Sequence, residues 1–344
     1  QRQAMARIYL TVPKHLRTLH FGAEALARLE GLGEVITNPQ DRGPTTAEAI
    51  AAAGACDFIL CDRLTAGSAE LFAALPKLKA FLRRSVDMHG VDIEAASKLG
   101  ILVTHAVPGF VAAVTELMVA QMVNLARKVP EQVMAYRDGA IPKLGMGVQV
   151  SGKVAGIIGM GRIARRLAAI LQAMEIRILA HDLYVEDWPE GVEPTTLDGL
   201  LGEADFVILL AVRSDETENI MNAETFARMK PSAYFVNFSR GGLVDEDALY
   251  EVLTSGGIAG AALDVGRETG GEEAGDVVPV RLGALPNVVA TAHTAAMVPD
   301  AMLTQSMTSV EQLADIIAGR EPAYALNTER ASRLKLAPRA GGNP

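Results

Sequence analysis

Two polar side chains stand where apolar runs end, and together they could act on a small substrate. Arg240 follows the run "AYFVNFS", and His293 closes the run "NVVATAH". A guanidinium offers a planar pair of donors to a carboxylate or an α-keto acid, and an imidazole exchanges a proton near neutral pH. Both residues are predicted at the carboxyl edge of a parallel sheet, where ligands bind in such folds. On spacing alone, Arg240 could equally pair with Asp245 or Glu246, and a single histidine is more often structural.

A glycine-rich turn is the strongest local signal for a cofactor. The run "KVAGIIGMGRIARR" leads an apolar strand through Gly159 and Gly161 directly into a helix that begins with Arg162 and Ile163. Gly159 permits the tight turn, and Gly161 lets the backbone approach a pyrophosphate at the positive helix N-terminus. Arg162 could pair with that pyrophosphate or be solvated. Asp182 ends the next strand about twenty residues on, where a carboxylate accepts the ribose hydroxyls and repels a 2′-phosphate. The pattern favours NAD over NADP.

The elements that must position these residues follow from the apolar pattern. Apolar runs alternate with helical patterns, which indicates parallel βαβ units and an α/β fold. A long helix begins near residue 109 with apolar residues on most of its circumference, so it is predicted to be buried in a core or a subunit interface. From residue 151, six short apolar strands predict a doubly wound sheet covered on both faces. Residues 331–344 are expected to form a loose tail.

Composition excludes several classes of function. The 344 residues suit two domains, and the net charge of −9 argues against binding nucleic acid through a basic field. No apolar stretch is long enough for a bilayer, and no secretion pattern opens the chain, so a cytoplasmic protein without membrane partners is expected. No metal-ligand pattern is visible. Cys56 and Cys61 are interpreted as small core residues in a reducing compartment rather than a disulfide or metal pair.

The motifs "LVTHAVPG", "GKVAGIIGMGRIARRLAA", "MKPSAYFVNFSRGGLVDEDAL", "GIAGAALDV" and "LPNVVATAH" resemble, in order and spacing, the D-isomer-specific 2-hydroxyacid dehydrogenases. The resemblance implies two Rossmann-like domains. A flavodoxin-like substrate domain is formed by both chain ends, residues 1–108 plus 297–330. It surrounds a central, doubly wound NAD-binding domain, residues 109–296, whose long first helix supports a homodimer.

The resemblance also implies an activity and a set of site residues. The family transfers hydride between NAD and C2 of a small 2-hydroxy or 2-keto acid. Arg240 would bind the carboxylate and carbonyl of the substrate, and His293 would exchange the proton with its oxygen. The remaining cofactor contacts carried over are Asp264 at the nicotinamide carboxamide, Phe238 and Ser239 on the nicotinamide side, and Ala211 and Val212 on the adenosine side.

Two loops depart from the family pattern around the substrate. Ser85, Val86 and Asp87 replace the usual "GVG"-like turn whose backbone N–H groups hold the carboxylate. These amides are still expected to bind substrate, but Asp87 brings a negative charge close to an anion unless its side chain points away. Phe110 and Val111 follow the "PG" turn where an Asn is often found, which predicts a more apolar mouth.

The third departure concerns the carboxylate that would partner His293. The family pattern "DVFxxEP" places a glutamate that hydrogen-bonds the catalytic histidine and keeps it protonated at useful pH. Here position 269 is Thr, Glu268 stands one residue early, and the loop is longer than usual. Glu268 is the predicted catalytic partner, and Glu272, Glu273 or no glutamate at all are the alternatives.

Two other functions fit parts of the pattern. A non-catalytic NAD-binding dimer of the same fold would explain the unusual "SVD" and "DVGRET" segments, although the intact Arg240 and His293 disfavour it. A formate dehydrogenase-like enzyme would share the scaffold, but it would pair the histidine with a glutamine that this sequence lacks near position 269.

Overall fold

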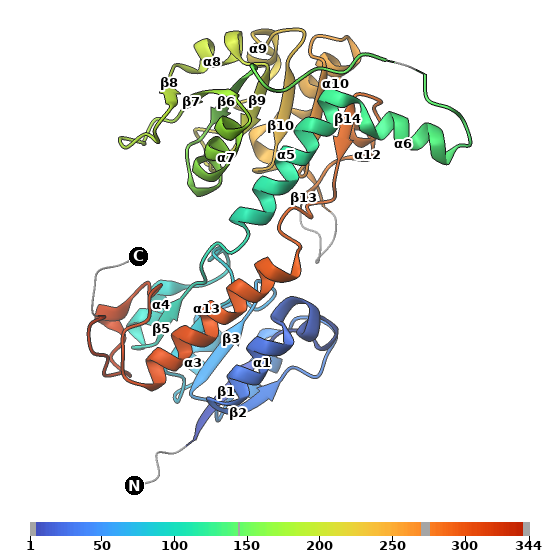
Figure 1. The fold of residues 1–344 in the computed structure, drawn as a ribbon. Helices are drawn as coiled ribbons and strands as arrows, with labels where there is room; N and C mark the ends of the chain where they lie inside the picture. The colour runs from blue at the N-terminus through green and yellow to red at the C-terminus, as the bar shows by residue number, and fades with distance from the viewer. Residues whose placement is uncertain (1–4, 144, 270–275, 340–344) are drawn as a thin grey trace. The chain divides into compact units, whose positions relative to one another are not determined.

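The computed structural model describes residues 5–143, 145–269 and 276–339. The chain divides into two compact units, Gln1–Gly109 with Val298–Pro344 and Phe110–Met297. Each unit is built on its own parallel sheet with helices on both faces (Figure 1). The predicted α/β class with two Rossmann-like domains, one made from both chain ends and one central, is thereby confirmed.

The first unit contains a five-stranded parallel sheet in the order β2-β1-β3-β4-β5, the flavodoxin-like order. Its strands alternate their side chains between two cores: Ile8 and Leu10 face one helical layer, and Tyr9 faces the other. The elements of this unit are β1 (Ala6–Leu10), η1 (Lys14–Leu16), η2 (Arg17–Phe21), α1 (Ala23–Glu30), β2 (Gly33–Thr37), α2 (Thr46–Ala53), β3 (Phe58–Cys61), α3 (Ala69–Ala74), β4 (Ala80–Arg83), α4 (Ile93–Lys98), β5 (Leu102–Thr104), α13 (Pro299–Ile317) and η4 (Thr328–Arg330).

Both cysteines belong to the core of this unit. Cys56 and Cys61 are free and buried, and burial raises the pKa of the Cys61 thiol to about 12. A thiol held protonated in this way is a poor nucleophile and metal ligand. The interpretation of the two cysteines as core residues is confirmed.

The segment after η4 is not a loose tail over its described part. Ala331 is buried, and Leu334 and Leu336 pack against the same core as α13. The Nη1 of Arg333 donates to the carbonyl oxygens of Leu75 (3.0 Å) and Leu78 (2.6 Å) beyond the end of α3. Sequence reading missed this because the alternating leucines are few and their binding surface is made by distant residues.

The second unit contains a seven-stranded parallel sheet in the order β14-β11-β10-β9-β6-β7-β8. The strand order reverses between β6 and β9, the position where such sheets bind ligands. The elements are α5 (Val111–Arg127), α6 (Val129–Arg137), β6 (Val154–Ile158), α7 (Arg162–Ala173), β7 (Arg177–His181), β8 (Val192–Pro194), α8 (Leu197–Glu203), β9 (Phe206–Leu209), α9 (Ala223–Ala227), β10 (Tyr234–Asn237), η3 (Gly241–Leu243), α10 (Glu246–Thr254), β11 (Gly260–Leu263), β12 (Glu268–Thr269), β13 (Asp276–Val277), α12 (Val280–Gly283) and β14 (Val288–Ala290).

The long helix α5 is buried over much of its surface within this unit. Met118, Met122 and Leu125 lie in the core beneath the sheet, and the helix runs against α7 (Figure 1). In contrast, α6 buries none of its residues. Over the described residues, no helix is both long and apolar enough to cross a membrane.

Candidate active site

The glycine turn lies between β6 and α7, beside the end of β9. Gly159 adopts φ +92°, and a Cβ there would stand 2.6 Å from the Cα and N of Ala211. Its N–H donates to the carbonyl of His181 at 2.8 Å. The turn is therefore held between the ends of β7 and β9, and only glycine satisfies both the left-handed backbone and the close approach.

Gly161 has a different task, because its backbone is unstrained. It is the N-cap residue of α7 with φ −77°, and a Cβ built on it would meet no atom within 4 Å. The first turn of α7 carries no acidic side chain and no side-chain cap, so its N–H groups can receive an anion. Arg162 is exposed and Ile163 packs partly against the core. This open, positively polarised end fits the pyrophosphate of NAD.

Asp182 stands directly beside the glycine turn. Its Oδ2 accepts the N–H of Met160 at 2.8 Å, and its Oδ1 accepts the N–H of Tyr184 at 2.9 Å. The carboxylate is thus fixed at the end of β7, where the adenosine ribose is expected. Ala211 follows β9, and Val212 is 82% exposed, which leaves an apolar side chain available for an adenosine ring.

One contact near the adenosine side escaped the sequence analysis. The hydroxyl of Tyr184 donates to Oε2 of Glu216 at 2.6 Å, which joins the loops after β7 and β9. The Glu216 carboxylate raises the pKa of the Tyr184 hydroxyl. Nothing in the local pattern signals this pair, since 32 residues separate its members.

Arg240 is presented by a turn that follows β10. The side chain of buried Asn237 accepts the N–H of Ser239 at 3.1 Å and donates to the carbonyl of Arg240 at 3.4 Å. Ser239 also donates its hydroxyl to the carbonyl of Ala211 at 2.5 Å, and Phe238 is buried in the core. The guanidinium is exposed and bonds only the adjacent Ser239 carbonyl, at 2.8 Å, among the described residues.

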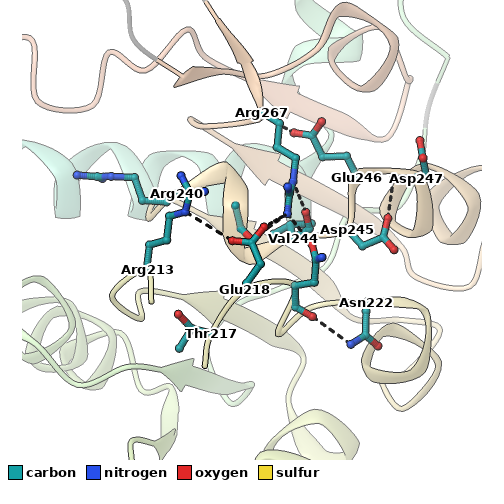
Figure 2. A network of polar contacts seen from close by, with 12 residues as sticks. Arg213, Thr217, Glu218, Asn222, Arg240, Val244, Asp245, Glu246, Asp247 and Arg267 are labelled. Carbon is teal, nitrogen blue, oxygen red and sulfur yellow. Dashed lines mark hydrogen bonds and ion pairs between the residues drawn. The ribbon is translucent and has the colours of Figure 1, made fainter. Parts of the chain in front are cut away.

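The surface-pair alternative for Arg240 is therefore not observed. Asp245 caps α10 by accepting the N–H groups of Asp247 and Ala248, each at 3.1 Å. Glu246 accepts the N–H of Arg267 at 2.7 Å. In Figure 2, the Arg240 side chain extends away from both carboxylates.

His293 lies in a segment that the carboxylate of Asp264 holds in place. Asp264 directly follows β11 and is 2% exposed. Its carboxylate accepts the Thr291 hydroxyl (2.5 Å) and the N–H groups of Thr294 (3.0 Å) and Ala295 (3.2 Å). Its backbone carbonyl accepts the N–H of His293 at 2.8 Å.

The backbone of His293 is strained, as it is at three other non-glycine residues among those described, Lys128, Glu175 and Asn219. The φ of +54° at His293 lies in the left-handed region, which costs a non-glycine residue about 1–2 kcal/mol. Strain of this kind persists only where surrounding contacts enforce it, and it concentrates at active sites. Here the enforcing contacts come from Asp264, a role that the resemblance did not assign to it.

The glutamate partner of His293 stays a prediction. Glu268 begins β12, and its backbone pairs antiparallel with Val277, but its side chain lies outside the described part of the structure. Glu272 and Glu273 fall outside the described residues altogether. A Cβ on Gly266, where the family pattern has Phe, would stand 2.5 Å from the carbonyl oxygen of Val277. The returning strand therefore occupies the space that the aromatic ring would need.

In the first unit, the predicted substrate loop follows β4. Asp87 turns its carboxylate back onto its own loop, where Oδ1 accepts the N–H of His89 at 2.9 Å. The hydroxyl of Ser85 donates to the carbonyl of Asp87 at 3.1 Å. Within the described ranges, no intramolecular hydrogen bond uses the backbone N–H groups of residues 85–87, so these donors are available to a carboxylate.

No group of three or more histidine, cysteine, aspartate or glutamate side chains is arranged to hold a metal ion in the part of the chain that the structure covers. Eight of the predicted site residues follow strands of the same parallel sheet: Gly159, Gly161, Asp182, Ala211, Ser239, Arg240, Asp264 and His293. These features define a dinucleotide-binding dehydrogenase domain of the doubly wound class.

The comparison with known families makes that class specific. Residues 119–295 match the D-isomer specific 2-hydroxyacid dehydrogenase, NAD binding domain. The chain belongs to this family, and its cofactor is NAD. The predicted resemblance and cofactor are confirmed.

Curated and solved relatives agree with this assignment. The chain is 33% identical over 290 residues to a D-3-phosphoglycerate dehydrogenase of Synechocystis sp., covering 83% of this chain and 51% of the relative. It is 34% identical over 263 residues to the enzyme of that name from Archaeoglobus fulgidus, covering 75% and 49%. The chain thus spans about half the length of these curated relatives.

Among solved structures, D-lactate dehydrogenase with NAD+ from Lactobacillus jensenii is similar with a TM-score of 0.81 and 26% identity, covering 93% of this chain and 99% of that one. The TT0316 protein from Thermus thermophilus is similar with a TM-score of 0.79 and 30% identity, covering 93% and 99%. The similarity covers 93% of this chain and therefore includes both of its units.

Proposed function

We propose that this protein is an NAD-dependent oxidoreductase that interconverts a small D-2-hydroxy acid and its 2-keto acid. The observation that carries the proposal is the placement of Arg240, Asp264 and His293. They follow β10, β11 and β14, which are neighbouring strands of the sheet that also carries the glycine turn. Because all these strands are parallel, the three side chains share one edge with the cofactor turn.

Each residue has a task that its chemistry supports. The exposed guanidinium of Arg240 binds the carboxylate and the carbonyl oxygen of the 2-keto acid through paired donors. In the first unit, the carboxylate of Asp87 accepts the N–H of His89 at 2.9 Å, which supports the prediction that the backbone N–H groups of Ser85, Val86 and Asp87 bind a carboxylate. The cofactor, when bound, would supply the hydride as NADH in reduction and would accept it as NAD+ in oxidation. His293 gives a proton to the substrate oxygen in reduction and recovers it in oxidation.

We propose Glu268 as the carboxylate that keeps His293 protonated, with Glu272, Glu273 or no glutamate as alternatives. A carboxylate close to an imidazolium raises the pKa of the imidazole. Glu268→Gln should therefore shift the basic limb of the kcat/KM profile for 2-keto acid reduction to lower pH. Glu272→Gln and Glu273→Gln are the matched controls. A shift in one of the controls instead would reassign the partner, and no shift in any variant would refute a glutamate role.

Stopped-flow oxidation of NADH tests the proposed function. The 2-keto acid panel is glyoxylate, pyruvate, hydroxypyruvate and 3-phosphohydroxypyruvate, with formate and NAD as a separate assay for the alternative reaction. We expect turnover of at least one panel member. NADH binding with no turnover of any member would refute the proposal and leave a non-catalytic NAD-binding protein.

The variant that tests His293 is chosen from its backbone conformation. Asn tolerates the left-handed region better than Ala does, so His293→Asn removes the proton donor while keeping the loop. We expect kcat to fall by roughly 10²–10⁴-fold, the usual contribution of a general acid, with NADH affinity nearly unchanged. A kcat close to that of the wild-type chain would exclude His293 as the acid–base residue.

We also propose that two copies of this chain associate through α6 and the segment after it. This helix buries none of its residues. Its apolar side chains include Met134, which is 54% exposed, and Tyr136, which is 68% exposed, and in the segment after it Ile141 and Met146 are 88% and 92% exposed. An exposed apolar group of this kind marks an interaction surface. Light scattering should report a dimer, and Met134→Glu with Tyr136→Glu should give a monomer.

A further inference from the structure

Arg267 makes a set of contacts that the proposed chemistry does not use. It lies between Asp264, directly after β11, and β12. Its Nε and Nη2 donors are committed to atoms of this chain, as Figure 2 shows. The acceptors are the carbonyl oxygens of Val244 (2.9 Å) and Gly242 (2.8 Å), Oε1 of Glu218 (3.0 Å) and Oδ1 of Asn219 (2.5 Å), while the backbone N–H of Arg267 donates to Oε1 of Glu246 (2.7 Å).

These acceptors come from two segments, both distant from Arg267 in the sequence. Glu218 and Asn219 belong to the loop after β9, which begins beside the glycine turn. Gly242 and Val244 belong to the turn that follows Arg240. One side chain therefore connects the β9 loop, the arginine turn and the start of β12.

The arginine turn itself is packed tightly against this segment. A Cβ on Gly241 would collide with the carbonyl group of Gly266. A Cβ on Gly242 would stand 2.7 Å from Nε of Arg213, which in turn pairs with Glu218 at 3.5 Å. The backbone after Arg240 thus packs against Gly266 at Gly241 and against Arg213 at Gly242. Arg267 donates hydrogen bonds to the same turn.

We propose that Arg267 is a positioning residue for the keto-acid site. It fixes residues 241–244, and it thereby fixes where the guanidinium of Arg240 is presented. Its Nε and Nη2 donors are already committed within the chain, so the role proposed for Arg267 is exerted through the turn that presents Arg240. This inference rests on the function proposed above.

The hydrogen bonds from Arg267 to backbone carbonyl oxygens are expected to contribute most to holding the turn after Arg240. The Arg267–Glu218 ion pair is more than a third exposed on both sides, and exposed pairs contribute little. Hydrogen bonds from a charged donor to carbonyl oxygens of a turn are stronger and fix the turn geometrically. The same turn also accepts backbone N–H groups of the β9 loop, from Asn219 to the carbonyl of Gly242 and from Met221 to the carbonyl of Leu243, each at 3.1 Å. Arg267 adds charged side-chain donors to the carbonyl oxygens of Gly242 and Val244.

The experiment compares four proteins: wild type, Arg267→Ala, Arg267→Lys and the control Arg177→Ala. Arg177 is also an exposed arginine with two glutamate partners, Glu193 and Glu203. It is the first residue of β7 and therefore lies at the amino ends of the parallel strands, away from the carboxyl ends that carry the site. For each protein, kcat and KM are measured with the 2-keto acid panel, NADH Kd by fluorescence titration, and Tm by thermal unfolding.

We expect Arg267→Ala to lower kcat/KM for the 2-keto acid by roughly 10- to 100-fold, as small misplacements of an orienting group do. NADH Kd should stay within about twofold of wild type, since the glycine turn and Asp182 are untouched. Arg267→Lys keeps the charge and some donors, so it should recover part of the loss. Arg177→Ala should leave kcat/KM unchanged.

Three outcomes overturn the inference alone: unchanged kcat/KM in Arg267→Ala, an equal loss of NADH affinity, or an equal loss in Arg177→Ala. If Arg267→Ala does not fold, Arg267→Lys decides, and a kcat/KM equal to wild type overturns the inference. A wild-type chain that turns over no panel member overturns the proposed function and this inference together.

Discussion

Replacing each glycine of the cofactor turn by alanine separates folding from cofactor binding. Gly159→Ala forces a side chain into φ +92°, at about 1–2 kcal/mol. It also places a Cβ 2.6 Å from the backbone of Ala211, and overpacking of this kind costs about 1–3 kcal/mol. The free energy of unfolding should therefore fall by about 2–5 kcal/mol, the sum of the two ranges.

Gly161→Ala should behave in the opposite way. Its φ of −77° suits any residue, and its Cβ meets no atom within 4 Å. The gain of about 0.4–1 kcal/mol from a stiffer unfolded chain nearly offsets the poorer N-cap of Ala relative to Gly. Stability should change little, while a methyl group in the space of the pyrophosphate should weaken NADH binding by roughly 10- to 100-fold, or about 1.4–2.8 kcal/mol.

Urea unfolding without cofactor and fluorescence titration with NADH measure the two effects independently. The ratio of NADH Kd values is compared only for protein that is folded at the assay temperature. These separate roles are refuted if Gly161→Ala binds NADH as wild type does. They are equally refuted if Gly161→Ala loses as much stability as Gly159→Ala, because the two positions would then share one structural role.

Three further substitutions test the loops around the site. Asp264→Asn presents an NH₂ group in place of one acceptor oxygen, so stability should fall by about 1–3 kcal/mol and kcat should fall with it; unchanged urea midpoint and kcat would contradict the anchoring role. Burial raises the pKa of Glu246 above its ordinary 4.5, so the folded chain holds this proton more tightly and its stability falls as pH rises through the raised pKa. Glu246→Gln cannot ionise, so its stability relative to wild type should rise between about pH 4 and about pH 7. Urea midpoints of both proteins at the two pH values measure this, and a relative stability that falls over the same interval would contradict the prediction. Gly241→Ala should displace the Gly266 carbonyl and raise KM for the 2-keto acid more than NADH Kd, and equal changes in both constants would argue against a local effect.

The sequence predicted the parts of the site that depend on local pattern. Gly159, Asp182, Arg240 and His293 each follow a short apolar run, and the sheet places every one of them after a parallel strand. A buried parallel strand is a continuous apolar run, so its end is visible in the sequence. Because ligands bind at these ends, position and chemistry could be inferred together.

Contacts between loops could not be predicted in the same way. Arg267 reaches Glu218 across 49 residues and Gly242 across 25, and neither spacing belongs to a helix or a hairpin. Its charge and its place in a Gly- and Glu-rich segment resemble those of any solvated residue. The packing of Gly241 against Gly266 and the backbone hydrogen bonds from Asn219 and Met221 to Gly242 and Leu243 bring these segments together, and these contacts exist only in the folded chain.

The loop after β11 also shows why a family pattern does not transfer residue by residue. The added length lets β13 return beside Gly266, where Val277 leaves no room for a side chain. A sequence with a shorter connection can place a Phe there and reach its glutamate directly. In this chain the same space is filled by the backbone of Val277, so the family spacing from the aspartate to the glutamate does not carry over directly.

Asp264 connects the fold to the chemistry most closely. A carboxylate offers about four acceptor sites, and three of them are taken by Thr291, Thr294 and Ala295. Those three bonds hold the strained backbone of His293, and Oδ2, which accepts only one of them, keeps a site for an amide donor such as the nicotinamide carboxamide. The predicted cofactor contact and the observed anchoring role are therefore compatible in one side chain. We therefore expect the position of the proposed proton donor and the position of the nicotinamide to be coupled, since both would depend on the same buried carboxylate after β11.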